Sequence, residues 1–362
     1  MPDIAIIGGG IIGLLTAREF SETGASVVLI DRQTAGREAS WAGGGILMPL
    51  YPWRQAEAIG VLMSLSLSMY PSLTESLNDA TGIDPERIKS GLLVADNPDI
   101  EKAVSWCQAH SIRVQQPSPE EIRMLMPNVR VRTNNPLWLP EIAHVRNPRL
   151  LQSLKADLKA RGVRILEDHE VTGLDQSKGK VVRINTVADA VSADFVILAT
   201  GAWSGRLWKN LIPELRIEPV KGQMLLFDAK PGLLNQMILS GAQYLIPRRD
   251  GKILSGSTVE HTEFDKSTTE DARELLKKFA SETLPALRNF KVERHWAGLR
   301  PGTPSGIPYI DKHPEIENLS ICCGHFRNGL VLGPASARLL ADLVLGRPPT
   351  MDPAPYAIGA AH

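Results

Sequence analysis

The sequence predicts an α/β fold in which a parallel-sheet domain is interleaved with a smaller α+β domain built on a mixed or antiparallel sheet. Three observations support this prediction. A glycine-rich stretch separates an apolar strand from an apolar helix within residues 4–31, a second apolar strand over 194–198 ends in small residues, and residues 218–296 are rich in strand patterns. The chain has 362 residues, 43% of them apolar, which is typical of about two domains with buried cores.

The N-terminal stretch carries a G-x-G-x-x-G pattern. The apolar run Ile4–Ile7 leads into Gly8, Gly10 and Gly13, apolar residues then recur at helical spacing, and a second apolar strand ends at Asp31. Gly8 permits a tight turn, Gly10 lets the backbone approach a pyrophosphate at a helix N-terminus, and Gly13 allows close packing. Asp31 is placed to accept hydrogen bonds from an adenosine ribose. We therefore expect a Rossmann-like domain that binds a dinucleotide.

Two further segments of small residues follow this unit. Residues 39–45, Ala-Ser-Trp-Ala-Gly-Gly-Gly, either wrap a second anionic or planar group or form a glycine-rich loop without chemistry. The buried strand over 194–198 ends in Ala199-Thr200-Gly201, followed by Trp203. Because ligands of such folds bind at the carboxyl ends of parallel strands, we expect this edge to face the same cofactor.

The domain organisation follows from the order of these patterns. An apolar helical pattern over 56–79 reads as core, and a module with a strand, two helices and a proline-rich passage interrupts the α/β pattern before it returns. We expect a discontinuous nucleotide-binding domain and an interleaved substrate-binding domain. The first comprises residues 1–80, 144–217 and 297–362, and the second comprises residues 81–143 and 218–296.

Two helix signals can be placed more closely. A helix in the second half of the substrate domain is expected to begin at a capping box over Thr268–Asp271. The last helix is expected to carry Pro334 in its first turn and to end at Gly346.

Composition excludes several classes of partner. Forty basic and forty acidic residues give a formal net charge of zero, so nothing attracts nucleic acid or an anionic membrane. The three cysteines form neither a disulfide framework nor a zinc motif. The longest apolar runs are shorter than the ~20 residues that span a bilayer, and the first strand starts too close to Met1 for a signal peptide. We expect a cytoplasmic protein with a small-molecule partner and no metal.

Four stretches together resemble the flavin-dependent D-amino-acid oxidase family, and most closely its glycine-oxidising branch, which is associated with thiamine biosynthesis. The resemblance covers nearly the whole chain. The chain departs from the family pattern in two places. Asp31 stands where many flavin enzymes carry Glu, and Arg32 beside it leaves open a ligand with a 2′-phosphate. The stretch Gly324–Gly329 lacks the tyrosine that D-amino-acid oxidases proper carry there. The stretches are Gly8–Gly13 with Asp31, Ala39–Gly44, Trp296–Pro301 with Thr303–Gly306, and Gly324–Gly329.

The resemblance implies a non-covalent FAD in a domain of the glutathione-reductase type. The nucleotide-binding domain would then hold the cofactor through backbone and side-chain groups of its turns and helix ends. The residues that we expect to contact FAD are Gly8, Gly10, Ile11, Ile12, Gly13, Asp31, Arg32, Ser40, Ala42, Gly43, Gly44, Val171, Thr200, Gly201, Trp203, His325, Arg327, Asn328, Gly329 and Leu330.

The resemblance also implies a substrate site. Arg300 offers a planar fork for bidentate pairing with a carboxylate, unless it serves a surface ion pair. Tyr244 can donate a second hydrogen bond to the same carboxylate, although a tyrosine in a strand, taken alone, is more often simply packed. Arg327 would lie near the substrate amino group or the flavin, or in a structural salt bridge, and Met48 could trim the pocket. No residue is expected to act as acid or base, because a neutral amine loses its Cα hydrogen as hydride to flavin N5. His325 is expected to face the flavin or to support a residue that does.

The implied reaction is oxidative deamination of glycine and other small amines, including sarcosine and small D-amino acids. The products would be an α-keto acid such as glyoxylate, ammonia or a primary amine, and hydrogen peroxide from O₂. The resemblance further suggests that the enzyme supplies dehydroglycine for the thiazole of thiamine, and that it is a homo-oligomer, either a dimer or a tetramer.

Three alternatives remain open from the sequence. A flavin amine dehydrogenase would pass electrons to a quinone or a protein carrier instead of O₂. A sarcosine-oxidase-like enzyme would hold its flavin covalently, for which Cys322 and Cys323 are candidates in an unexpected position. A non-catalytic nucleotide-binding regulator would leave Arg300 and Tyr244 without a shared purpose.

Overall fold

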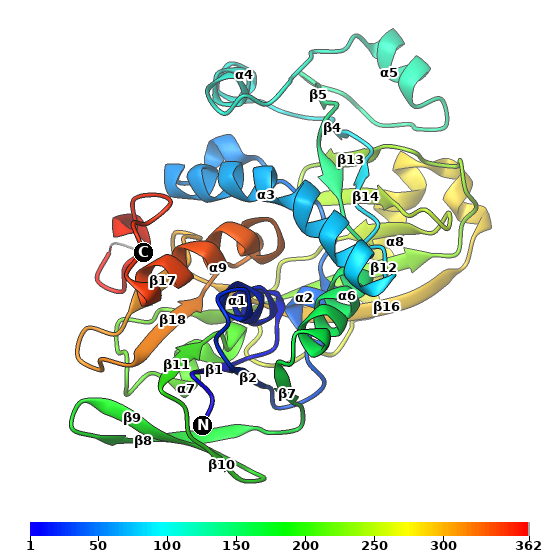
Figure 1. Ribbon diagram of the computed structural model, residues 1–362. Helices are drawn as coiled ribbons and strands as arrows, with labels where there is room; N and C mark the ends of the chain where they lie inside the picture. Colours follow the sequence, from blue (N-terminus) through cyan, green and yellow to red (C-terminus); the bar gives the residue numbers. More distant parts are fainter. Residues whose placement is uncertain (361–362) are drawn as a thin grey trace.

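The computed structural model of the protein describes residues 1–360; residues 361–362, the last two of the expected nucleotide-binding domain, lie outside the described residues. Two large sheets and the helices packed on them make up the molecule (Figure 1). The first sheet has the strand order β17-β18-β11-β1-β2-β7, and all neighbours are parallel except β17 and β18. Its strands are β1 (Ile4–Ile7), β2 (Val27–Ile30), β7 (Arg164–Leu166), β11 (Phe195–Leu198), β17 (Tyr309–Lys312) and β18 (Leu319–Cys323).

The six-stranded sheet is buried on both faces. Ile4 and Ile6 of β1 belong to one core cluster, whereas Ala5 and Ile7 belong to another, as the two-residue period of a strand requires. One face is covered by helices, of which α1 packs against both α6 and α9, and the other face is covered by the small sheet β10-β9-β8 (Figure 1). These elements are α1 (Ile11–Ser21), α3 (Glu57–Thr81), α6 (Asn147–Ala160), α9 (Gly329–Leu345), β8 (Val171–Ser177), β9 (Lys180–Thr186) and β10 (Ala190–Val191).

The second large sheet has the order β16-β12-β15-β14-β13-β4-β5 and is antiparallel except between β13 and β4. One of its faces packs under α8, and Leu245 of β14 points to this side. The neighbouring residues Tyr244 and Ile246 therefore point to the opposite side, toward the first sheet. The strands and helix are β4 (Leu92–Val94), β5 (Leu137–Leu139), β12 (Glu218–Phe227), β13 (Met237–Ser240), β14 (Gln243–Pro247), β15 (Ile253–Gly256), β16 (Val292–Gly302) and α8 (Glu270–Thr283).

Short elements complete the described chain. Helices α4 and α5 lie at one end of the molecule, beside β4 and β5 (Figure 1). The expected glycine-rich loop after Asp31 contains a single helical turn, α2. The bounds are α2 (Ala39–Ala42), α4 (Ile100–Ala109), α5 (Pro119–Leu125), α7 (Ser204–Leu207), β3 (Ile88–Lys89), β6 (Ala143–His144) and 3₁₀ turns at Pro52–Arg54, Gly201–Trp203, Pro285–Asn289 and Ala354–Tyr356.

The expected capping box of α8 is wrong in its register. The N-cap is Thr269, whose side chain accepts a hydrogen bond from the Ala272 amide at 3.4 Å. Ala272 has no side-chain acceptor to return to the N-cap amide. That amide instead donates to Gln223 Oε1 at 3.0 Å, so a residue of β12 completes the cap.

The expected position of Pro334 is also wrong. Helix α9 begins at Gly329, so Pro334 lies in its interior, where it has no N–H for the carbonyl of Leu330. Tyr70 of α3 donates its hydroxyl to that carbonyl at 2.5 Å, and Ser66 of α3 accepts from the amide of Ala335 at 3.0 Å. The packing of α3 on α9 therefore replaces the missing helical hydrogen bond. The end of α9 at Gly346, in the left-handed conformation, is confirmed.

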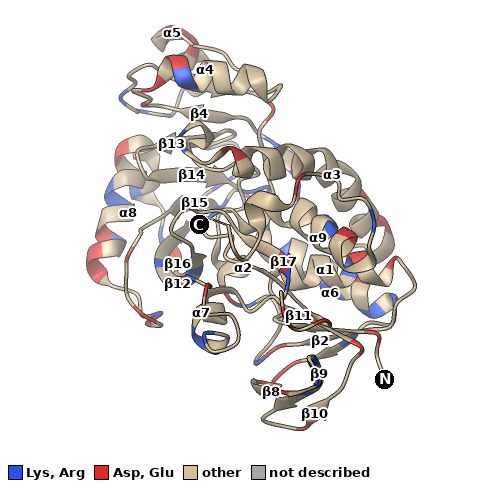
Figure 2. Cartoon of the chain, turned by 90° about the vertical axis from the view of Figure 1, so that its left-hand side faces the viewer, with Lys and Arg blue, Asp and Glu red and all other residues tan. Residues whose placement is uncertain are grey.

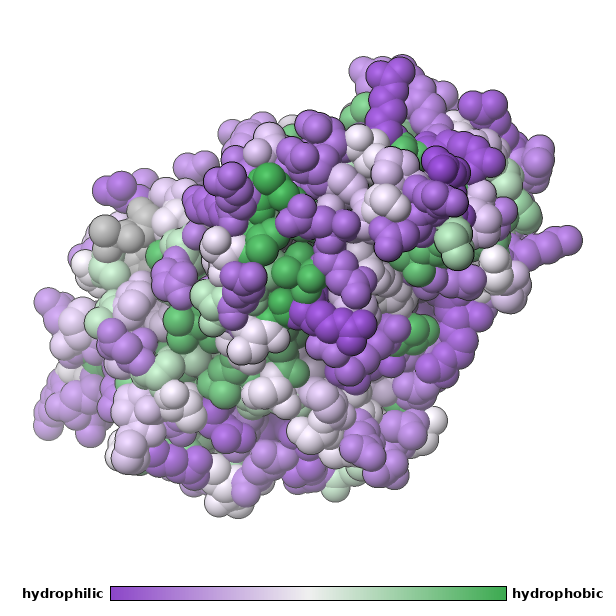
Figure 3. Space-filling view, turned by 90° about the horizontal axis from the view of Figure 1, so that it is seen from above, coloured by the Kyte–Doolittle hydropathy of each residue, from purple (hydrophilic) through white to green (hydrophobic). Residues whose placement is uncertain are grey.

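Basic and acidic residues are interspersed along the visible helices, strands and loops in Figure 2. Seen from above, hydrophilic residues cover most of the molecule, and hydrophobic ones gather near the middle of the view (Figure 3). Among the described helices, none is both long and apolar enough to cross a bilayer.

Candidate active site

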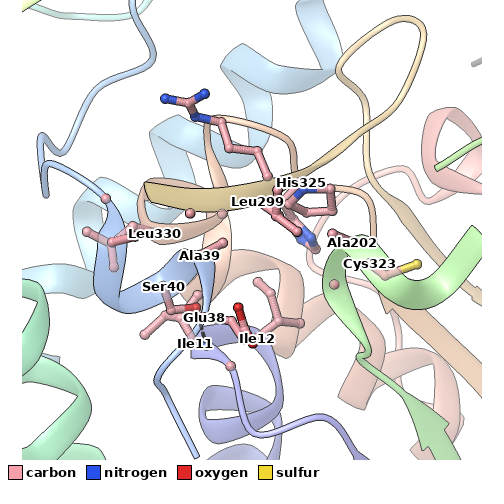
Figure 4. A pocket seen from close by; sticks show the side chains of 18 of the residues that line it. Ile11, Ile12, Glu38, Ala39, Ser40, Ala202, Leu299, Cys323, His325 and Leu330 are labelled. Carbon is pink, nitrogen blue, oxygen red and sulfur yellow. Dashed lines mark hydrogen bonds between the residues drawn. The ribbon is translucent and has the colours of Figure 1, made fainter. Parts of the chain in front are cut away.

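A long pocket lies between the two large sheets. It is lined on one side by the turn after β1, the ends of β11 and β18 and the start of α9, and on the other by β12, β14 and β16. In Figure 4, Ile11, Ser40, Leu330 and His325 surround a common space although they come from distant parts of the chain. Every site residue expected from the sequence lines this pocket except Gly13, which lies beneath the glycine turn.

The glycine turn brings the N-terminus of α1 to the pocket. Gly8 has φ of +110°, and a Cβ there would lie 2.3 Å from the carbonyl oxygen of Ala199. A Cβ on Gly13 would lie 1.8 Å from the Gly8 oxygen, so only glycine permits this contact between α1 and the turn. Gly10, Ile11 and Ile12 line the pocket where the positive end of the α1 dipole opens, as a pyrophosphate site requires.

Asp31 and Arg32 lie at the far end of this turn. Asp31 accepts hydrogen bonds from the amides of Gly9 at 2.7 Å and Gln33 at 3.0 Å, and burial raises the pKa of its carboxyl. Arg32 donates to Glu38 at 2.5 Å, and its guanidinium lies 3.6 Å from the ring centre of Trp203. Arg32 is therefore held by Glu38 and Trp203 and does not point freely into the pocket.

Arg300 is the main charged group at the opposite end of the pocket. Its guanidinium donates to the carbonyls of Lys221 and Thr258, both at 3.2 Å, and to the hydroxyl of Ser257 at 2.9 Å. All three acceptors are neutral, and no Asp or Glu of the described chain forms an ion pair with it. Burial lowers the pKa of Arg300 to about 10. The alternative of a surface ion pair is therefore wrong for this residue.

Arg327 and Tyr244 lie close to Arg300. Burial lowers the pKa of both guanidiniums, and the nearby Tyr244 side chain opposes this effect. The charge of Arg327 lowers the pKa of Arg300 further. The Nη2 atom of Arg327 is buried without a hydrogen-bond partner, and no described carboxylate pairs with this side chain. Two half-buried cations and a phenol thus lie together at this end of the pocket, and no described carboxylate forms an ion pair with either cation, an arrangement that suits an anionic ligand.

His325 and Met48 are both buried and line the pocket. Burial lowers the pKa of His325 to about 3, so the ring is neutral at physiological pH. Its Nε2 lies 3.0 Å from the hydroxyl of Ser336, which donates its own proton to the Leu332 carbonyl at 2.9 Å. Nε2 therefore carries the imidazole proton, and α9 holds the ring in place.

Sequence reasoning missed several residues of the pocket. Asn147, at the start of α6, is 1% exposed and donates to the Ser40 carbonyl at 2.8 Å, while its Oδ1 has no partner. Gly222 leaves room for the Arg300 guanidinium, since a Cβ there would lie 2.1 Å from Arg300 Nη2. Met224 and Ser257 also line the pocket. Of these residues, only Asn147 could be noticed in the sequence, because it precedes a proline at the start of a helix. That position indicates a helix start and does not indicate a ligand site.

The fold and this pocket define a class of dinucleotide-dependent oxidoreductase. A model of the FAD dependent oxidoreductase family matches residues 3–343, and the chain belongs to this family. The pocket fits the cofactor, because it combines a helix N-terminus, a buried carboxylate at the end of β2 and apolar walls. The α/β fold class and the FAD dependence expected from the sequence are thereby confirmed.

Individual relatives match the chain along its length. A glycine oxidase of Pseudomonas aeruginosa is 46% identical over 355 residues, which cover 98% of each chain. The solved structure of glycine oxidase from Geobacillus kaustophilus superposes with a TM-score of 0.95 at 26% identity, covering 100% of this chain and 99% of that one. The bifunctional protein ThiO/ThiG of Trichormus variabilis is 32% identical over 95% of this chain and 52% of its own length.

Proposed function

We propose that this FAD-dependent oxidoreductase oxidises glycine and other small amines, including sarcosine and small D-amino acids. One observation carries the proposal: two half-buried guanidiniums that form no ion pair with a described carboxylate lie with Tyr244 in the cofactor pocket. The similarity to glycine oxidases over 98% of the chain supports the choice of substrate. The overall change would be glycine, O₂ and water to glyoxylate, ammonia and hydrogen peroxide.

The four residues expected to bind the substrate then each have a separate role. Arg300 would pair with the substrate carboxylate, and Tyr244 would donate a second hydrogen bond to it. Arg327 would lie beside the substrate or the flavin, and Met48 would limit the room for a side chain on Cα. This arrangement would present the Cα–H bond to the cofactor and exclude water.

The cofactor would be held by the turns of the first sheet. The N-terminus of α1 would face the pyrophosphate, Asp31 the ribose, and the starts of α2 and α9 the remaining polar groups; the other pocket residues named from the sequence would complete the contacts. When bound, FAD would supply the two-electron acceptor. No acid or base is assigned, and the neutral ring of His325, tied to Ser336, would act as a wall.

Several further features are part of the proposal. The flavin would be non-covalent, because burial raises the pKa of Cys323 to about 12 and that of Cys322 well above its usual value, which leaves both thiols protonated. The first sheet with its helices would form the FAD-binding domain and the second the substrate-binding domain. The expected boundary at residue 297 falls inside β16, which belongs to the second sheet as far as Gly302. The likeness to ThiO/ThiG supports supply of dehydroglycine for thiamine. A cytoplasmic homo-oligomer completes the proposal.

An anaerobic absorbance experiment tests the proposed reaction. Glycine should bleach the ~450 nm flavin band of the purified protein, and admission of air should restore the band with release of hydrogen peroxide. Rapid bleaching with slow restoration would instead indicate a dehydrogenase that uses another electron acceptor. A flavin band that no small amine bleaches would contradict the assigned substrate class.

A further inference from the structure

The segment 257–269 connects β15 to α8 and touches both ends of the pocket. It is irregular apart from one bridge between Lys221 and Glu260, and most of its residues after Val259 are exposed or half-buried. Its first residues, Ser257 and Thr258, accept the hydrogen bonds of Arg300. Its later residues reach the elements that line the adenosine end, α2 and the turn after β11.

Phe264 of this segment packs on Trp203, with ring centres 5.6 Å apart and planes tilted by 32°. Trp203 lines the cofactor pocket and carries the guanidinium of Arg32 against its ring. Arg206 in turn lies 4.5 Å from the ring centre of Phe264. An aromatic and cationic stack therefore joins a pocket wall to a residue that is not itself part of the pocket lining.

Lys266 makes a second contact to the same wall. Its ammonium donates to both carboxylate oxygens of Glu38, at 3.1 and 3.2 Å. Glu38 lines the pocket (Figure 4) and also accepts hydrogen bonds from Arg32 and Gln33. The segment thus contacts both Trp203 and Glu38, the two side chains that fix Arg32.

Buried Lys221 fixes the middle of the segment. It is 2% exposed and pairs with Glu260 at 3.2 Å and Asp265 at 3.1 Å. Because Asp265 stands between Phe264 and Lys266, this pair sets the position of both. The segment is attached through Lys221 to the substrate-side sheet and through Phe264 and Lys266 to the first sheet.

We propose that segment 257–269 strengthens the binding of FAD by positioning side chains of the pocket wall. Phe264 positions Trp203 and, through it, Arg32, whereas Lys266 positions Glu38. Without Phe264, the Trp203 and Arg32 side chains would gain rotamers that cofactor binding must then remove, so affinity would fall. The proposal rests on the FAD dependence of the family and is independent of which amine is oxidised. Phe264 and Lys266 are positioning residues, since neither lines the pocket.

The test measures FAD binding to the apoprotein by quenching of flavin fluorescence. Phe264→Ala should raise the Kd for FAD about threefold to tenfold, and Phe264→Leu should fall between it and the unmodified protein. Lys266→Gln should raise the Kd by about twofold at low salt and by less at high salt, because its ion pair is partly exposed. Val259→Ala is the matched control, since Val259 is 42% exposed on the same segment and should leave the Kd unchanged.

Urea unfolding of each apoprotein separates positioning from a general loss of structure. Because Phe264 acts on local rotamers of the free protein, the Kd of Phe264→Ala should exceed that of Val259→Ala by more than any difference between their apoprotein midpoints accounts for. Equal Kd values for these two variants would overturn the proposal, as would a loss of FAD affinity fully matched by loss of apoprotein stability. Should Phe264→Ala not fold, a Kd of Lys266→Gln equal to that of the control at low salt would overturn it.

Discussion

At the scale of single residues, the neutral surroundings of Arg300 are the informative feature of the site. Its three acceptors are neutral and no described carboxylate contacts it, and Gly222 provides the space in which the guanidinium lies. A partly buried charge that contacts no carboxylate favours a ligand that supplies one. The substrate carboxylate would meet this requirement.

Arg300→Lys is therefore expected to weaken substrate binding while retaining the flavin. A lysine keeps the charge but cannot reproduce the planar fork, so KM for glycine should rise about tenfold to a hundredfold. Steady-state peroxide release gives KM, and the flavin absorbance band reports cofactor content. Arg294→Lys is the matched control, because Arg294 stands on the same strand with its side chain 62% exposed. An unchanged KM in Arg300→Lys would refute the anchor assignment.

At the scale of elements, the junction of α3 and α9 shows how tertiary packing supports a proline inside a helix. Tyr70→Phe removes the donor to the Leu330 carbonyl and should lower the free energy of unfolding by about 1–3 kcal/mol. In a Pro334→Ala background the helix regains an N–H for this carbonyl, so the same substitution should then have a smaller effect. Urea unfolding of the four proteins of this cycle measures the difference. Equal effects in both backgrounds would show that the Tyr70 hydroxyl does not replace the hydrogen bond that Pro334 removes.

At the scale of the whole molecule, buried neutral histidines link stability to pH. Burial, aided at His144 by the charge of Arg248, lowers the pKa values of His144 and His325 to about 3. In the unfolded chain each takes up a proton near pH 6.5, so the unfolded state binds more protons below that pH. Their contribution is fully present above pH 6.5 and is lost as pH falls toward 3, at up to about 1.4 kcal/mol per pH unit for each histidine.

His325→Gln should flatten this dependence by one proton between pH 6.5 and 5, a window above the titration of most carboxyl groups. The measurement is the free energy of urea unfolding at several pH values. Exposed His261→Gln is the control that removes a histidine from the surface. A slope in His325→Gln equal to that of the unmodified protein would show that His325 does not contribute.

Local sequence patterns were sufficient for the first strand–turn–helix unit of the cofactor half and for the strand that follows it. Gly8, Gly10 and Gly13 with the flanking apolar runs determine strand, turn and helix through neighbouring residues, and Asp31 follows directly at the end of the next strand. These choices need no distant partner, because backbone sterics and hydrophobic periodicity act over a few residues. The resemblance added Arg300, Tyr244 and Arg327 as candidates, without their surroundings.

Only the tertiary structure decided what surrounds those candidates. Tyr244, Arg300 and Arg327 come from β14, β16 and the segment after β18, and their meeting depends on how the two sheets pack. The same holds for the contact of Phe264 with Trp203, for Tyr70 at the carbonyl freed by Pro334, and for the free oxygen of Asn147. By itself the sequence determined the local elements and the cofactor turn; charge compensation, hydrogen-bond completion and pocket shape are set by residues far apart in the chain, which no local pattern encodes.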